Sequence, residues 1–255
     1  MPGKSRIKLI RSLKDKKSRK RHRLFIAEGE KTVKELLLSD WKVHSVYALK
    51  EWLADNPVDG DFEIYPVDQA TLRQISMQKT PNSVVALAHT RIPCNNEVLQ
   101  PGKLTLLLDT VQDPGNLGTL IRICDWFGIP GIICSQGCAD VYNPKVVQAA
   151  MGSIFRIKVR YASIKKVISS PGYKEAPVYG AFLEGESVYS HPLGESGFIL
   201  LGNESKGISH EISHLVNHRL KIPSFPAGGN SSESLNVAVA GGIIVSEFRR
   251  KHPLL

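Results

Sequence analysis

The second half of the chain is marked by short, uninterrupted apolar runs separated by stretches with helical periodicity. Such runs are typical of strands in a parallel sheet that is buried on both faces. They occupy residues 104–108, 131–134, 178–183, 198–201 and 220–222. We therefore expect an α/β domain with a mainly parallel sheet. Ligands in these sheets bind beyond the carboxyl ends of the strands, which directs attention to the loops after Leu108, Leu183, Leu201 and Ile222.

The first half of the chain alternates between strand-like and helical patterns. Strands are predicted at 24–27, 43–49, 62–67 and 83–89. Helices are predicted at 31–38 and 68–75, the second of them capped by Asp68. Residues 91–102 contain turn formers and little apolar periodicity, which is typical of a linker. The expected organisation is a small α/β domain at 1–92, a linker at 93–102 and a second domain at 103–255.

Positive charge is concentrated at the start of the chain. Residues 1–23 hold eleven Lys or Arg against one acid, whereas the formal charge of the whole chain is +9, so the rest carries −1. Ile7, Ile10 and Leu13 recur at helical spacing between these cations, which favours an amphipathic helix that contacts RNA. A solvated basic arm is the alternative. The candidate RNA-binding residues are Arg6, Lys8, Arg11, Lys14, Lys17, Arg19, Lys20 and Arg21.

Composition also predicts what the protein lacks. No stretch approaches the roughly 18 consecutive apolar residues of a membrane span, and the N-terminus has no apolar signal-peptide core. We expect a cytoplasmic protein with no membrane partner. The four cysteines include Cys134 and Cys138, but no second pair or nearby histidines complete a zinc site, so we expect reduced thiols and no metal.

Two of the predicted strand-end loops carry candidate chemistry. Residues 109–119 include two glycines and the Asn116 amide, and precede a helix predicted at 120–127. Its free N–H groups would face an anion, and the Arg122 guanidinium within it can bind a phosphate. Neither this loop nor residues 202–207 match a P-loop or a dinucleotide-binding motif. Taken alone, the glycines could equally serve packing.

Polar residues also follow the later strands. Gly202, Asn203 and Glu204 stand directly at a strand end. Ser234 and Asn236 lie near the start of the C-terminal helix, where either could be a simple cap.

Taken jointly, three segments resemble the motifs of the SpoU (TrmH-type) RNA 2′-O-ribose methyltransferases, a family of the SPOUT superfamily. They are residues 113–122 with Asp125, Phe127 and Gly128, residues 201–204, and residues 234–240. Residues 143–153 resemble the family's intervening helix, so the likeness covers roughly 103–250. More weakly, residues 5–13 and 25–29 are similar to the RNA substrate-binding domain that often precedes this catalytic domain.

The resemblance implies a SPOUT methyltransferase domain with a trefoil knot, preceded by a small α/β RNA-binding domain. It implies S-adenosyl-L-methionine as methyl donor and a homodimer formed through the knotted domain. The catalytic residues it implies are Arg122, Asn116, Ser234, Asn236 and Glu204. The donor contacts it implies are Phe182, Leu183, Leu201, Gly202, Asn203, Ile222, Leu235 and Ala240.

The expected function is methylation of a ribose 2′-hydroxyl in ribosomal or transfer RNA. Arg122 is a poor base because an arginine pKa exceeds 12, so we expect it to act through an RNA phosphate or to stabilise the forming alkoxide. Glu204 could hold Arg122 or a residue of an adjacent subunit. Residues 224–233 are longer and richer in Gly and Ser than the family's usual loop, which suggests a flap that orders on donor binding. The alternatives are a non-catalytic RNA-binding protein with a decayed methyltransferase domain, or an RNA base methyltransferase of the same superfamily.

Overall fold

A computed structural model describes residues 2–225 and 233–252, which form two compact units. The first unit contains the residues up to Arg91 together with Asp140–Phe155. The second contains Ile92–Ala139 and the chain from Arg156 onward. A segment from the middle of the sequence therefore belongs to the N-terminal unit.

The first unit is built on a four-stranded sheet, in the order β1-β4-β2-β3. Strand β4 (Val84–His89) runs antiparallel to β1 (Leu24–Glu28) and β2 (Val43–Ala48), and β2 runs parallel to β3 (Glu63–Pro66). All four strands were predicted to within two residues. The helices are α1 (Lys4–Ser12), α2 (Lys16–His22), α3 (Glu30–Leu37), α4 (Lys50–Asp55), α5 (Gln69–Ile75) and α8 (Pro144–Ala150), followed by the short η1 (Ser153–Phe155).

Local signals explain which helices of this unit were predicted. Asp68 caps α5 as expected, because its carboxylate accepts a hydrogen bond from the N–H of Thr71 at 2.8 Å. Helices α2 and α4 were not predicted. The α2 sequence, KKSRKRH, has no apolar stripe to mark it.

The basic N-terminal segment is part of the folded core. Ile10 and Leu13 are fully buried and pack in one cluster with residues of the sheet, including Tyr47 and Leu87. Ile7 packs against the same cluster. The expected amphipathic helix is therefore present as α1, and the alternative of a solvated arm is wrong.

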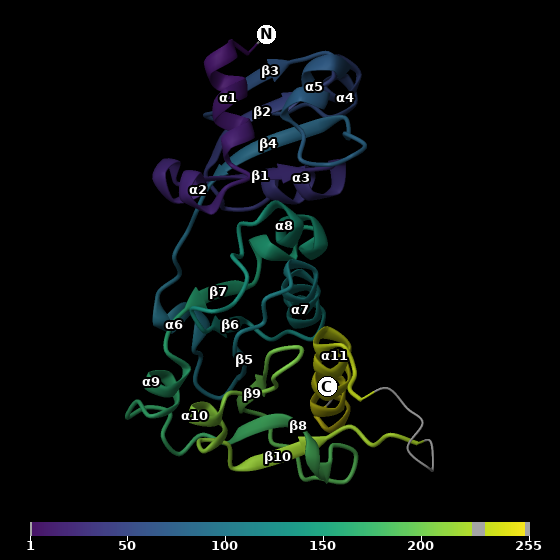
Figure 1. The fold of residues 1–255 in the computed structure, drawn as a ribbon. Helices are drawn as coiled ribbons and strands as arrows, with labels where there is room; N and C mark the ends of the chain where they lie inside the picture. Colours follow the sequence, from purple (N-terminus) through teal and green to yellow (C-terminus); the bar gives the residue numbers. More distant parts are fainter. Residues whose placement is uncertain (1, 226–232, 253–255) are drawn as a thin grey trace. The chain divides into compact units, whose positions relative to one another are not determined.

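The second unit is built on a six-stranded sheet in the order β10-β8-β9-β5-β6-β7, and every strand pair is parallel (Figure 1). Its strands are β5 (Leu104–Leu108), β6 (Gly131–Cys134), β7 (Lys158–Tyr161), β8 (Val178–Ser187), β9 (Gly197–Leu201) and β10 (His218–Lys221). All five predicted apolar runs are strands. Strand β7 was not predicted because Lys158 and Arg160 interrupt its apolar run at the edge of the sheet.

The helices of this unit are α6 (Asn95–Val98), α7 (Pro114–Trp126), α9 (Ile164–Ile168), α10 (His210–Ser213) and α11 (Val237–Lys251). Helices α7 and α11 pack against each other (Figure 1). No helix in the described ranges is long and apolar enough to cross a membrane.

Two boundaries differ from the sequence prediction. The expected linker contains α6, and its residues Val98 and Leu99 are buried in the core of the second unit. Strand β8 does not end at Leu183. Its ladder to β10 shifts from the pair Gly180 and Arg219 to the pair Glu186 and Leu220, so residues 181–185 form a bulge outside the parallel pairing.

Candidate active site

The two central strands β5 and β9 end side by side, and their following loops are joined by hydrogen bonds. Leu108 pairs with Leu201 at the carboxyl ends. The buried carboxylate of Asp109 accepts a hydrogen bond from the N–H of Ser209 at 2.8 Å. The Asn203 side chain donates to the carbonyl oxygen of Thr110 at 2.8 Å. The loops therefore form one polar platform at the sheet edge where ligands are expected.

The loop after β5 is shorter than predicted, because α7 begins at Pro114 rather than at residue 120. The Asp113 carboxylate caps the helix by accepting from the N–H of Asn116 at 2.9 Å, and Pro114 occupies the first helical position. Asn116 is therefore in the first turn. Arg122 lies in the third turn, and the free N–H groups expected near residue 120 lie inside the helix.

Glu204 connects the loop after β9 to the start of α7. Its carboxylate accepts a hydrogen bond from the Asn116 side-chain amide at 3.0 Å. It also accepts from the backbone N–H groups of Asp113 at 3.3 Å and Gln112 at 3.4 Å. Partial burial raises the pKa of Glu204, but these hydrogen bonds outweigh that effect and lower its pKa below the ordinary value. Glu204 is thus a carboxylate at neutral pH.

Asn236 brings the start of α11 into the same network. Its side-chain oxygen caps α11 by accepting from the N–H of Ala238 at 2.9 Å. Its side-chain amide donates to the side-chain oxygen of Asn116 at 2.8 Å. Asn236 is therefore a cap and a site residue at once, and a hydrogen-bonded chain runs from Glu204 through Asn116 to Asn236.

The structure does not bring the other two predicted catalytic residues into this hydrogen-bonded network. Arg122 is exposed on α7 and makes no hydrogen bond or ion pair with the described residues. The expectation that Glu204 holds Arg122 is not met within this chain, because Glu204 instead binds Asn116 and two backbone amides. Ser234 is also exposed and makes no hydrogen bond with the described part of the chain.

The predicted donor contacts lie on four segments. Leu201 and Gly202 are buried at the end of β9, where Asn203 and Gly207 exchange two backbone hydrogen bonds at 2.9 Å. A Cβ atom at Gly202 would collide with the backbone of Gly207, so only glycine permits this turn. The other contacts are Phe182 and Leu183 in the β8 bulge, half-buried Ile222 after β10, Leu235 before α11, and Ala240 within α11.

These residues suit a nucleoside-type methyl donor. Leu183 is 74% exposed and Leu235 is 47% exposed, so the described chain leaves large apolar side chains uncovered at two of the four segments. Apolar walls with nearby backbone amides are the usual environment of an adenine ring. Most of the glycine-rich stretch 224–233 lies outside the described residues, and so does the flap expected there.

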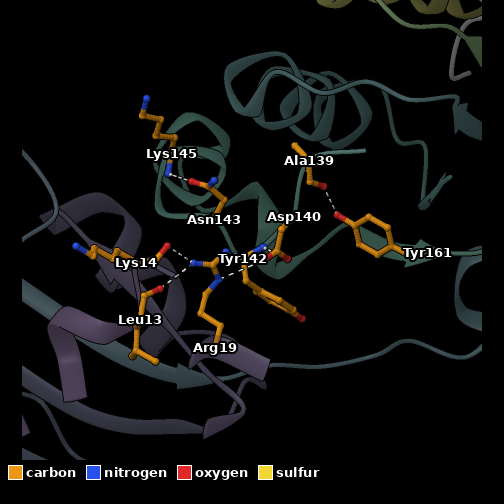
Figure 2. A network of polar contacts seen from close by, with 9 residues as sticks. All are labelled: Leu13, Lys14, Arg19, Ala139, Asp140, Tyr142, Asn143, Lys145 and Tyr161. Atoms are coloured by element: carbon orange, nitrogen blue, oxygen red, sulfur yellow. Dashed lines mark hydrogen bonds and ion pairs between the residues drawn. The ribbon is translucent and has the colours of Figure 1, made fainter. Parts of the chain in front are cut away.

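Arg19 is not available to RNA, contrary to the sequence prediction. Its side chain is 4% exposed and donates to the Asp140 carboxylate at 2.6 Å. It also donates to the carbonyl oxygens of Leu13 at 2.8 Å and Lys14 at 2.7 Å (Figure 2). Sequence reasoning missed this role because Asp140 lies 121 residues away. Arg19 joins α2 to the segment 140–155 within the first unit.

Arg6 is also engaged, since its guanidinium pairs with Glu63 at 2.5 Å and lies over the Tyr65 ring at 4.6 Å. The hydrogen bond to Glu63 raises the pKa of Arg6. The other six candidate RNA-binding residues are exposed and make no ion pair with the described residues. They are Lys8, Arg11, Lys14, Lys17, Lys20 and Arg21.

Fold and site together define a parallel α/β protein with a polar site at the carboxyl ends of its central strands. The chain belongs to the SpoU rRNA methylase family, whose profile matches residues 103–246. Residues 4–86 match the MRM3-like substrate binding domain.

Individual relatives agree with this assignment. The chain is 31% identical to the 23S rRNA (guanosine(2553)-2′-O)-methyltransferase RlmP of Bacillus subtilis, over 96% of each chain. It is similar in structure to an RNA methyltransferase of the TrmH family from Porphyromonas gingivalis, with a TM-score of 0.87 and 38% identity over 98% of this chain and 99% of that one. It is also similar to an AdoMet-bound rRNA methyltransferase from Sinorhizobium meliloti, with a TM-score of 0.84 and 30% identity over 100% and 98% of the two chains.

Proposed function

We propose that this protein transfers a methyl group from S-adenosyl-L-methionine to a ribose 2′-hydroxyl of ribosomal RNA. The observation that carries the proposal is the hydrogen-bonded chain Glu204–Asn116–Asn236, which ties the three family motifs together at the carboxyl end of the sheet. A decayed methyltransferase domain would have no reason to keep this chain intact.

The reaction is a displacement in which the hydroxyl oxygen bonds to the methyl carbon and the hydroxyl proton passes to an RNA phosphate or to water. When bound, the donor supplies a methyl group on a sulfonium, whose thioether leaves as a neutral group and needs no acid. The protein must therefore hold the hydroxyl in line and ease loss of its proton.

The ionised Glu204 fixes the orientation of the amides that face the substrate. A carboxylate only accepts hydrogen bonds, so the NH₂ group of Asn116 faces Glu204 and its oxygen faces Asn236. We assign Asn116, Asn236 and Ser234 to hydrogen bonds that hold the ribose and its phosphate. Glu204 is a positioning residue that acts through Asn116.

Arg122 is suited to contact the substrate because no group in the described chain occupies its guanidinium. Its pKa above 12 makes it a poor base, so it binds the RNA phosphate or stabilises the forming alkoxide. We expect Arg122→Lys to lower turnover about a hundredfold. The control is Arg250→Lys. Arg250 is also exposed, but it pairs with Glu247 and has no proposed role in the reaction. Near-normal turnover of the Arg122 variant would refute this role.

The donor would be held by the β9 end, the β8 bulge and the residues that flank β10 and α11. In this arrangement Gly202 and Ile222 supply backbone groups, and Phe182, Leu183 and Leu235 supply apolar surface. Leu201, Asn203 and Ala240 complete the proposed contacts.

RNA is bound by the six exposed candidate residues named above, which lie on α1, on α2 and in the turn between them. Contacts between lysine or arginine and phosphates release counterions, so affinity falls as the salt concentration rises, and these contacts do not read the RNA sequence.

We further propose a trefoil knot in the second unit and a homodimer formed through that unit. We also propose a cytoplasmic location, since the relatives named above act on or resemble enzymes of bacterial ribosomal RNA. Trp126 on α7 is 86% exposed and Val239 on α11 is 52% exposed, which supports a partner surface on these two helices.

The decisive experiment is methylation of total RNA with labelled donor, followed by nuclease digestion and mass spectrometry. We expect a 2′-O-methylated nucleoside in the ribosomal RNA fraction. A base-methylated product would favour the base methyltransferase alternative, and label confined to transfer RNA would overturn the substrate class. Absence of donor binding by calorimetry would favour a non-catalytic RNA-binding protein.

A further inference from the structure

Two exposed histidines on α10 face each other with their ring nitrogens. His210 is the first residue of this short helix and His214 follows its last residue, so the two side chains are one helical turn apart on one face. Their Nε2 atoms lie 3.2 Å apart and their ring centroids 4.3 Å apart. Both rings are exposed to solvent.

This separation matches the distance between two nitrogen ligands of one metal ion. Zinc binds imidazole nitrogens at about 2.0–2.1 Å, so two of them on one tetrahedral ion lie about 3.3–3.4 Å apart. A cation can take the place between the two Nε2 atoms once the rings turn so that both nitrogens point at it. We propose that His210 and His214 chelate one divalent transition-metal cation through their Nε2 atoms, with water completing its coordination.

The second histidine pair of this unit is less suited to bind metal. His191 and His218 also approach through ring nitrogens, at 3.1 Å. The His191 side chain is only 8% exposed, however, whereas both rings of the α10 pair are open to solvent. The buried His191 ring leaves less room for the water ligands that a two-histidine site needs. His191 and His218 therefore offer a matched control.

The spacing His210-Glu211-Ile212-Ser213-His214 is that of a zinc peptidase helix, but a peptidase site is not what this geometry provides. Glu211 pairs with Lys165 at 3.2 Å instead of facing a metal-bound water. Across residues 2–225 and 233–252 no group of three or more metal-ligating side chains gathers. The site is thus an open two-ligand chelate that exchanges its ion readily.

Metal binding would stiffen the polar platform next to the proposed active site. Ser209 directly precedes α10, and its N–H is bonded to the buried carboxylate of Asp109. A clip across His210 and His214 holds the first turn of α10 closed and so restrains the end of the loop that carries Glu204. We expect saturating metal to raise the melting temperature of the wild-type protein.

The test is calorimetric titration of tag-free, metal-free protein with nickel chloride and zinc chloride. We expect one ion per chain, and His210→Ala and His214→Ala should each weaken affinity about tenfold or more. His218→Ala should bind as the wild type does. Circular dichroism of the metal-free variants checks their folding, which replacement of exposed side chains should leave intact.

An independent readout is a zinc-soaked crystal, in which an anomalous peak should lie between the two Nε2 atoms. Unchanged affinity in both α10 variants, loss of binding only in His218→Ala, or no binding by the wild type would each overturn the proposal. None of these results depends on whether the protein methylates RNA, so the two proposals fail separately.

Discussion

The Glu204 carboxylate accepts several hydrogen bonds at the candidate site, and its charge explains why. One carboxylate accepts hydrogen bonds from a side-chain amide and from the backbone amides of Gln112 and Asp113. These donors stabilise the ionised form and lower the pKa of Glu204. The negative charge then determines how Asn116 is oriented, and through it Asn236.

Asn116→Asp should disrupt this arrangement with a minimal change of shape. The variant replaces a donor by a second carboxylate directly opposite Glu204, so the two groups repel and the side chain turns away. We expect turnover to fall about a hundredfold, because small displacements of positioning groups cost this much. Steady-state kinetics with labelled donor measure the effect. Gln112→Ala is the control, since only the backbone of Gln112 binds Glu204; equal losses in both variants would argue against the role of the Asn116 side chain.

Glu204 also makes the stability of the fold depend on pH in a defined direction. Its pKa is lower in the folded state than in the unfolded chain, so ionised Glu204 stabilises the fold above the ordinary glutamate pKa of about 4.3. That contribution is lost as the pH falls through the folded-state pKa. Glu204→Gln should therefore be less stable than the wild type at pH 7, and the difference should shrink at more acidic pH. Urea denaturation at several pH values tests this, with the exposed Glu184→Gln as control; a pH-independent difference would contradict it.

Residues within local motifs were predictable, and those with distant partners were not. Asn116, Glu204 and Asn236 stand in short motifs at strand ends or helix starts, so the sequence places them near the site. Asp109 was missed, because an aspartate after a strand is usually solvated and its bond to Ser209 spans 100 residues. Arg19 was assigned to the wrong role for the same reason.

At the scale of elements, α1 and α2 use one short basic sequence for two purposes. Ile10 and Leu13 belong to the core of the first unit, while lysines on the other faces remain exposed. Deleting residues 1–23 would therefore unfold the unit instead of merely removing a grip. Point substitutions can separate the two purposes.

Arg19→Ala should lower the stability of the fold, whereas Lys17→Ala should lower the affinity for RNA. Removing Arg19 leaves the Asp140 carboxylate and two carbonyl oxygens without their donor, so we expect a loss of about 1–3 kcal/mol in the free energy of unfolding. Removing exposed Lys17 should leave stability unchanged but lower RNA affinity and reduce the salt dependence by about one counterion. Chemical denaturation and filter binding at several salt concentrations distinguish them. A stable Arg19 variant with a reduced salt slope would restore the original assignment.

Element boundaries followed the sequence where signals were local. Helix α7 carries its start signal in Asp113-Pro114, but two glycines in its first turns made residues 114–119 read as a loop. The β8 bulge could not be predicted, because it arises from the shift in pairing with β10 and not from the apolar run itself.

For the whole molecule, the important feature is that each compact unit is built from separate stretches of sequence. In the first unit, the Tyr142 ring packs on Phe25 at 4.8 Å between centroids. The Trp41 indole N–H donates to the carbonyl oxygen of Phe155 at 3.1 Å. Residues 140–155 thus complete a hydrophobic surface that the N-terminal residues leave open.

A fragment of residues 1–91 should therefore be unstable, although it contains all the residues that match the substrate binding domain. Without residues 140–155, the rings of Phe25 and Trp41 are exposed and Arg19 loses Asp140. We expect the fragment to unfold at lower urea concentration and to aggregate. The control joins residues 2–91 to 140–155 through a flexible linker. Equal stability of the two fragments would show that the added segment contributes nothing.

Because the first unit is built from two separate stretches of sequence, it also limits recombination between members of this family. The chain passes from one unit to the other at three points, next to residues 91, 139 and 155, so a single crossover does not separate them. A chimera joined only near residue 91 would set one parent's Phe25, Trp41 and Arg19 against the other parent's segment 140–155. Recombination between relatives therefore preserves a working protein only when both stretches are inherited together, and substitutions on the two should accumulate in matched pairs.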